Sequence, residues 1–247
     1  MKKFFKLLLI SFIIVLFGCG KEEKKEITIS AAASLKEVMN ELITKFESEN
    51  QNIKISINLG GSGALKNQII SGAPVDIVFF ASQSDLKDLD NKGMIEKNYN
   101  QDILKNRMVI AGKDKINDLS EIKNHKIAIG TPETVPAGKY AKEVLNNSNL
   151  WNEVQENIIF SKDVRSAMQY VEINEVDYAF IYKTDARIMK NGIISFIVPE
   201  NLHKPIIYSY GIIKDKDSKE VVKFYEFLKS KNAQALYEKY NFELANN

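Results

Sequence analysis

From Ile27 to its C-terminus, this 247-residue chain alternates short apolar runs with stretches of helical period. Runs such as ITISAAA and VDIVFFA have the length and the branched or aromatic content of buried strands. Between the runs, apolar residues recur every three or four positions, which predicts amphipathic helices. Strands that alternate with helices favour an α/β fold with mostly parallel sheets flanked by helices.

The pattern predicts the following elements, each bounded by turn residues or caps. Gly93 is placed to end the third helix. Strands are expected at 27–33, 53–59, 75–81, 107–112, 126–130, 157–161, 176–182, 192–198 and 206–213, and helices at 34–46, 64–72, 82–93, 137–147, 163–174, 184–190 and, as a pair, 217–240.

The first residues have the features of a secretion signal. Three lysines precede the apolar run LLLISFIIVLFG, which is too short to span a bilayer and ends at Cys19. The sequence LFGC resembles the lipobox of bacterial lipoproteins, which implies cleavage after residue 18 and acylation of Cys19. The charged run that follows predicts a solvated tether over residues 19–26. We therefore expect an extracytoplasmic protein held by lipid on the outer face of the cytoplasmic membrane, or in the periplasm of a Gram-negative cell.

Composition excludes several classes of function. Cys19 is the only cysteine, and His125 and His203 are the only histidines, so disulfides and thiolate or histidine metal sites are not expected. The chain has 34 Lys and Arg against 32 Asp and Glu, and without the three signal lysines the balance is 31 against 32, or −1. A nearly neutral protein lacks the basic surface of a nucleic-acid binder. We expect no cofactor and a monomer.

The mature length exceeds one comfortable hydrophobic core, which predicts two lobes. No linker of low complexity separates them, so crossing strands are expected to join them near Gly112 and near Lys204–Pro205. The predicted lobes are residues 27–111 with 205–247, and residues 112–204.

Two loops in the first half of the chain could hold an anion. Ser34 begins a helix with Glu37 three residues later, which is a capping-box pattern, so its hydroxyl serves either as a cap or as a ligand donor. The loop NLGGSGALKNQI is neither a P-loop, since Asn67 follows Lys66, nor a dinucleotide fingerprint, since the third glycine is absent. It offers bare amides and the Ser62 hydroxyl, and an anion nest and a plain tight turn remain equally open.

Three positions in the second half of the chain could also contribute hydrogen-bond donors to an anion. Pro136 fits the first position of a helix, and the small Ala137 and Gly138 that follow leave the first amides accessible. Asp163 can cap the helix that begins at Val164. Tyr182 ends a strand, where it either packs at the rim or donates one directed hydrogen bond.

These segments together resemble the molybdate-binding proteins of bacterial ABC importers. The matching stretches, which occur in the family's order over nearly the whole mature chain, are AAASL at 31–35, GGSGALKNQI and GAPVDI within 60–77, TPETVPAGKYA at 131–141, KDVRSAMQYVE at 162–172 and AFIYKTDA at 179–186.

The resemblance implies a two-lobed type II periplasmic-binding-protein fold and a binding protein, not an enzyme. It also implies that the molybdate oxygens, and not the metal directly, are contacted by the hydroxyls of Ser34, Ser62 and Tyr182 and by the amides of Ala137 and Val164. A membrane permease is the implied partner. Tungstate is nearly the same size as molybdate and is expected to bind too. A site for another oxyanion, such as sulfate, or a hydrolase on the same fold are the alternatives, and no serine has a plausible histidine partner for the latter.

Overall fold

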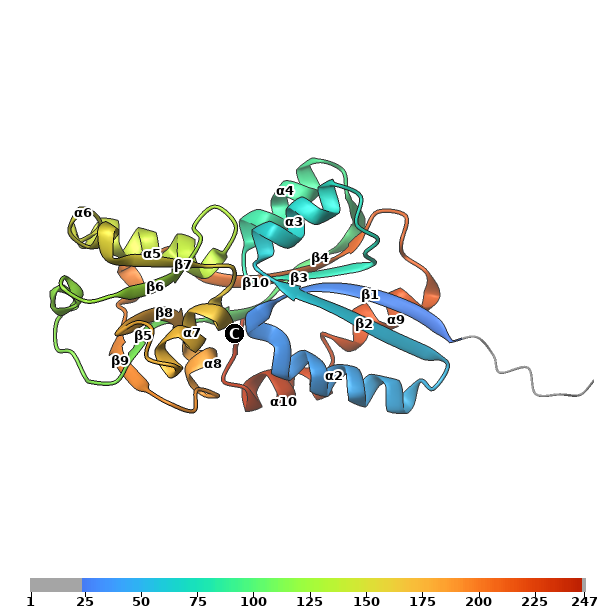
Figure 1. The fold of residues 1–247 in the computed structure, drawn as a ribbon. Helices are drawn as coiled ribbons and strands as arrows, with labels where there is room; N and C mark the ends of the chain where they lie inside the picture. The colour runs from blue at the N-terminus through green and yellow to red at the C-terminus, as the bar shows by residue number, and fades with distance from the viewer. Residues whose placement is uncertain (1–23, 246–247) are drawn as a thin grey trace, which may run out of the picture.

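The computed structural model describes residues 24–245, so the expected signal segment and Cys19 lie outside the described residues. Two mixed sheets lie side by side, each flanked by helices (Figure 1), so the α/β fold predicted from the sequence is confirmed. The first sheet has the order β11-β4-β10-β3-β1-β2. Its strands are β1 (Lys25–Ala32), β2 (Ile53–Gly60), β3 (Ile77–Phe80), β4 (Ile95–Asn106), β10 (Ile206–Ile213) and β11 (Glu243–Leu244).

The second sheet has the order β7-β6-β8-β5-β9. Its strands are β5 (Met108–Gly112), β6 (Ile127–Gly130), β7 (Ile158–Ser161), β8 (Tyr178–Tyr182) and β9 (Ile193–Ile197). Within the described residues, parallel pairing is confined to β2-β1-β3 and β7-β6-β8, and the other strand pairs are antiparallel. The sheets are therefore mixed, where the sequence predicted mostly parallel ones. We call each sheet with its helices the first unit and the second unit.

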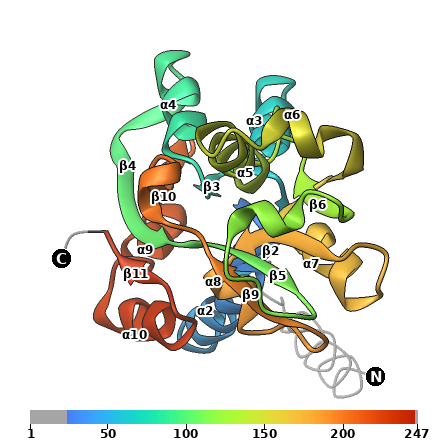
Figure 2. The same ribbon diagram turned by 90° about the vertical axis from the view of Figure 1, so that its left-hand side faces the viewer.

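Helices cover both faces of each sheet. In the first unit these are α2 (Lys36–Glu49), α3 (Ser62–Ile70), α4 (Gln83–Asn91), α9 (Lys219–Phe227) and α10 (Lys231–Lys239), with α3 and α4 on one face and α2 and α10 on the other. In the second unit they are α5 (Pro136–Asn147), α6 (Trp151–Val154), α7 (Val164–Glu172) and α8 (Lys183–Ala186). Figure 2 shows α5 and α7 on opposite sides of the second sheet, as right-handed crossovers in opposite directions require.

The short strand β3, with the sequence IVFF, is apolar at every position because both of its faces are buried. Ile77 and Phe79 belong to the main core, whereas Val78 and Phe80 belong to a second core beneath α3 and α4. Side chains of a strand alternate between faces, so a strand covered on both faces is hydrophobic at every position.

The chain passes between the sheets at Arg107, where β4 ends and β5 begins, and it returns between β9 and β10. The return segment lies between Ile197 and Ile206, and Gly112 pairs with Tyr178 inside the second sheet. The sequence missed β4 because the strand is largely polar and half-exposed, without the alternation that marks a buried face. The two-lobe division remains a prediction.

Candidate functional site

A small cavity lies where the carboxyl ends of the parallel strands of both units meet. Its empty space is about 200 Å³, including the part open to solvent. All five residues selected from the sequence line this one cavity. The lining residues are Ala32, Ala33, Ser34, Gly60, Gly61, Ser62, Ala81, Val135, Pro136, Ala137, Val164 and Tyr182.

The first unit contributes two serine hydroxyls. Ser62 is the first residue of α3 and is fully buried, and its Oγ accepts a hydrogen bond from the Ala81 amide at 3.0 Å. Ser34 lies in the short 3₁₀ turn Ala33–Leu35, also buried, with its Oγ 2.8 Å from the Tyr208 hydroxyl. The Ser34 hydroxyl is therefore held by a residue of β10, and the Ser62 hydroxyl by the residue that follows β3.

The predicted capping box at Ser34 is wrong. The 3₁₀ turn separates Ser34 from α2, which begins at Lys36 without a side-chain cap. Glu37 forms an ion pair with Arg165 of the second unit. The Ser34 hydroxyl is thus free of a capping role.

The second unit contributes the starts of two helices. Pro136 is the first residue of α5, and Asp163 caps α7 by accepting a hydrogen bond from the Ser166 amide at 2.8 Å, both as predicted. Ala137 and Val164 lie in the first turns of these helices, and both are buried. The first amides of a helix have no acceptor within the helix and carry its positive dipole end, so this side of the cavity favours negative charge.

Tyr182, at the end of β8, adds a buried phenol. Its side chain is 1% exposed, and its hydroxyl has no hydrogen-bond partner among residues 24–245. Burial raises the pKa of the Tyr182 phenol well above its ordinary value, so the group keeps its proton and can donate. A buried hydroxyl without a protein partner can donate its hydrogen to an acceptor in the cavity, such as a ligand or a water.

The two units touch beside the residues that line the cavity. The Ala64 amide of α3 donates to the Thr134 carbonyl of the second unit at 3.2 Å. A Cβ atom on Gly61 would lie 2.7 Å from that carbonyl oxygen, and one on Gly63 would lie 3.0 Å from the Thr134 backbone. Neither glycine has a positive φ. The glycines therefore admit the backbone of the opposite unit, and a tight turn does not explain them.

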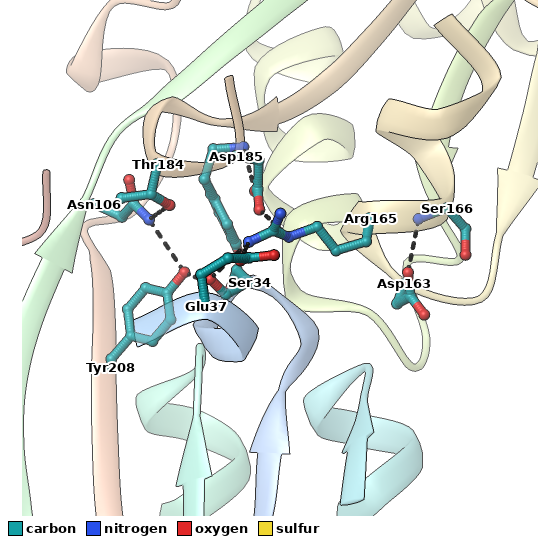
Figure 3. A network of polar contacts seen from close by, with 10 residues as sticks. Ser34, Glu37, Asn106, Asp163, Arg165, Ser166, Thr184, Asp185 and Tyr208 are labelled. Atoms are coloured by element: carbon teal, nitrogen blue, oxygen red, sulfur yellow. Dashed lines mark hydrogen bonds and ion pairs between the residues drawn. The ribbon is translucent and has the colours of Figure 1, made fainter. Parts of the chain in front are cut away.

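Arg165 links the two units beside the cavity (Figure 3). From α7 its guanidinium donates to the Ser34 carbonyl at 3.2 Å and pairs with Glu37, both in the first unit. It also lies 2.7 Å from the carboxylate of Asp185, which accepts a hydrogen bond from the Tyr182 amide at 3.1 Å. Burial raises the pKa of Asp185 to about 6, although Arg165 opposes the rise. Two carboxylates thus neutralise this cation.

The cavity itself has no fixed cation. None of its lining residues is Lys or Arg, and the described part of the chain contains no cluster of three or more His, Cys, Asp or Glu residues that could hold a metal ion. Among residues 24–245, no helix is long and apolar enough to cross a membrane. What the cavity offers a ligand is a set of N–H and O–H donors.

Comparison with known proteins agrees with this geometry. Residues 27–243 match the family model described as bacterial extracellular solute-binding protein. The chain belongs to this family. Its resemblance to the molybdate-binding proteins is confirmed at full length, since the molybdate-binding protein ModA of Escherichia coli is 30% identical over 92% of this chain and 92% of its own length.

Two other known proteins are similar to this chain, one in sequence and one in fold. The putative ABC transporter substrate-binding lipoprotein YvgL of Bacillus subtilis is 40% identical over 90% of this chain and 87% of its own. The periplasmic molybdate-binding protein of Azotobacter vinelandii has the same fold, with a TM-score of 0.80 at 21% identity over 89% of this chain and 100% of its own. Members of this solute-binding family are binding proteins and not enzymes, in agreement with the prediction.

Four residues around the site in this solute-binding protein were not selected from the sequence. Arg165 follows Val164 directly within the KDVR stretch, so its neighbourhood was a usable signal. Tyr208 and Asn106 had no local signal, because they reach the site through the pairing of β10 with β4, which are distant in sequence. Ala81 follows β3, whose place beside β1 and β10 is likewise set by long-range pairing.

Proposed function

We propose that this protein captures molybdate, and tungstate with it, in the cavity between the two units and delivers it to the permease of an ABC importer. The observation that carries the proposal is the buried, unpartnered Tyr182 hydroxyl in a cavity lined by donors and no fixed charge. Molybdate at neutral pH carries no proton and can only accept hydrogen bonds. A donor-only cavity satisfies such an ion at every oxygen.

Neutral donors are sufficient for a dianion. Hydrogen bonds to a charged acceptor contribute about 1.5–3 kcal/mol each, so about seven supply on the order of 10–20 kcal/mol. Association costs about 4–15 kcal/mol. The surplus corresponds to micromolar to nanomolar dissociation constants. The two helix starts distribute compensating charge without a lysine or arginine that would attract any anion.

The cavity selects among anions by whether the anion carries a proton and by the size of the anion. Hydrogen phosphate must donate its proton, and the cavity lining contains no carboxylate to accept it. Sulfate has the same charge and hydrogen-bonding needs as molybdate but is smaller, so a cage fitted to molybdate leaves sulfate with longer, weaker contacts. Tungstate matches molybdate in both respects.

Capture proceeds by closure of two lobes. Ser34 and Ser62 belong to the first unit, and Ala137, Val164 and Tyr182 to the second, so a bound ion favours the arrangement in which both sides touch it. We propose that residues 19–26 tether the protein to a lipid anchor at Cys19, outside the cytoplasmic membrane. The lipoprotein relative supports that anchor.

Titration calorimetry with molybdate, tungstate, sulfate and phosphate tests the proposal. We expect submicromolar binding of molybdate and tungstate, and binding of sulfate and of phosphate that is weaker by at least about a hundredfold. Sulfate binding equal to or tighter than molybdate binding would overturn the assigned ligand. Labelling with a radioactive fatty acid in cells tests the anchor, and label that persists in Cys19→Ala would exclude this site.

A further inference from the structure

Behind Ser34 lies a chain of buried polar side chains that ends at the passage between the two sheets. Its members are Ser34, Tyr208, Asn106 and Thr184, none more than 8% exposed. The Asn106 amide nitrogen lies 3.1 Å from the Tyr208 hydroxyl and 2.8 Å from Thr184 Oγ1 (Figure 3). Tyr208 in turn lies 2.8 Å from Ser34 Oγ.

The direction of these hydrogen bonds follows from the donors available. Asn106 Oδ1 accepts from the Arg107 amide at 2.9 Å, so the NH₂ group faces Tyr208 and Thr184. An amide NH₂ only donates, and the Tyr208 oxygen must therefore accept. Within residues 24–245, Ser34 Oγ is then the acceptor left for the one phenolic hydrogen.

This direction decides what Ser34 can offer a ligand. Its oxygen accepts from Tyr208, so its own hydrogen is left for the cavity. Ser62 is in the same state, because its oxygen accepts from the Ala81 amide. Both serines thus have a hydrogen free for the cavity, and one of the two lone pairs of each oxygen is already occupied.

We propose that Asn106 and Tyr208 are positioning residues that hold Ser34 as a hydrogen-bond donor, and that they thereby make the site reject oxyanions that carry a proton. This inference rests on the proposed function. Hydrogen phosphate has the charge of molybdate at about pH 8, but its P–OH needs an acceptor. If the second lone pair of Ser34 accepts the P–OH hydrogen, the serine's own hydrogen turns away from the ligand and loses its acceptor. One polar group then stays unpaired, which is costly in a buried site.

Burial supports the same direction. It raises the pKa of the Tyr208 phenol far above its ordinary value, so the hydrogen that Tyr208 donates is present throughout the pH range of a binding experiment. We call the hydrogen-bonded chain Ser34, Tyr208, Asn106 and Thr184 the relay. It also joins the units, because Asn106 ends β4 of the first unit and Thr184 lies in α8 of the second.

Asn106→Asp reverses the relay with almost no change of shape. The new carboxylate oxygen accepts from Tyr208, whose oxygen then accepts from Ser34, and a Ser34 lone pair faces the cavity. Tyr208→Phe removes the donor to Ser34 without reversing the rest. Thr184→Val is the matched control, because it removes the other partner of Asn106 and leaves the Tyr208 bond in place.

The measurement is the ratio of the dissociation constants for phosphate and molybdate at about pH 8, with the sulfate-to-molybdate ratio as a second control. We expect the phosphate ratio to fall at least tenfold in Asn106→Asp and several-fold in Tyr208→Phe. Thr184→Val should keep the wild-type ratio. Sulfate carries no proton, so its ratio should stay constant in all three variants, even where the added charge weakens every anion.

The outcomes separate this inference from the proposed function. A wild-type protein that does not bind molybdate refutes the function, and the relay falls with it. A wild-type protein that binds molybdate and rejects phosphate, with unchanged phosphate ratios in both folded variants, refutes the relay alone. Circular dichroism and thermal unfolding identify a variant that fails to fold, and the other variant then decides the question. A purely structural role would weaken all anions by one factor and leave the ratios constant.

Discussion

In the first unit, β2-β1-β3 are parallel neighbours, and in the second unit β7-β6-β8 have the same order and direction. In each set of three strands, the loops that follow the carboxyl ends of the strands lie at the same edge of the sheet. Ligands of open α/β sheets bind at this edge. The first unit places the side chains of Ser34 and Ser62 in its loops. The second unit places the helix starts of Ala137 and Val164 in the corresponding loops, and Tyr182 at the end of its third strand.

The two units therefore supply hydrogen-bond donors to the cavity in two different ways. The first unit uses hydroxyls that other strands hold in place, so its side of the cavity depends on side-chain identity. The second unit uses mainly backbone amides, whose direction is set by where a helix begins. Substitutions should therefore affect the two sides unequally, and contacts between the units should matter to both.

The largest effect is expected from Arg165→Met, which tests whether the units can be treated separately. It leaves the buried Asp185 carboxylate without its cation and should lower the free energy of unfolding by about 3 kcal/mol above pH 7. Chemical denaturation across a pH series measures it. Lys162→Met, a nearby exposed change, is the control, and an equal loss in both variants would contradict the role of the ion pair.

The same denaturation experiments at several pH values also measure how the ionisation of Asp185 affects stability. Its pKa is 3.8 in an ordinary environment and about 6 in the folded protein, so the folded chain binds more protons between these values. The stability from this group is complete below about pH 4 and is lost as pH rises through about 6. In Arg165→Met the Asp185 carboxyl keeps its proton to higher pH. The difference in the free energy of unfolding between the variant and the wild type should therefore shrink toward pH 5. A deficit independent of pH would argue against Asp185 as the affected group.

Gly61→Ala tests whether the glycine-rich loop serves the contact between units. The added methyl group would meet the Thr134 and Lys162 carbonyl oxygens at 2.7 and 3.2 Å. Since both obstacles are backbone, we expect molybdate binding to weaken by about 2–3 kcal/mol with little change in the stability of the unliganded protein. Gly60→Ala meets only Leu65 at 3.4 Å and should bind normally. Equal affinities in calorimetry would mean that the loop does not approach the second unit.

Ser34→Ala and Ser62→Ala test the side built from hydroxyls. Each removes one hydrogen bond to a charged acceptor and should weaken molybdate binding by about 2 kcal/mol. Ser62→Ala should also lower thermal stability, because the Ala81 amide loses its acceptor. Lowered stability at unchanged affinity in either variant would assign that serine a structural role only.

The smallest effect on binding is expected from Val164→Ala, on the side built from amides. The variant keeps the backbone N–H and should change molybdate affinity by less than about 0.5 kcal/mol, while core packing loses about 1 kcal/mol. Asp163→Ala should cost about 0.5–2 kcal/mol of stability through the lost cap. A loss of affinity in Val164→Ala as large as in the serine variants would break the distinction between the two sides.

Local patterns in the sequence were enough to predict much of the fold and most of the segments that line the cavity. The periodicity indicated the strands and helices, Pro136 and Asp163 marked the starts of α5 and α7, and Gly93 marked the end of α4. Such signals act within about one helical turn or one strand, so residues near in sequence carry them completely.

Other features depended on contacts that no local pattern encodes. Ser34 and Tyr208 are 174 positions apart, and Glu37 and Arg165 are 128 apart, so the sequence offered only the nearby capping-box explanation for Ser34 and Glu37. The polar strand β4 forms because β10 and β11 supply its partners. The sequence determined that residue 61 could come close to another backbone, and only the packing of the second unit decided which backbone fills that space.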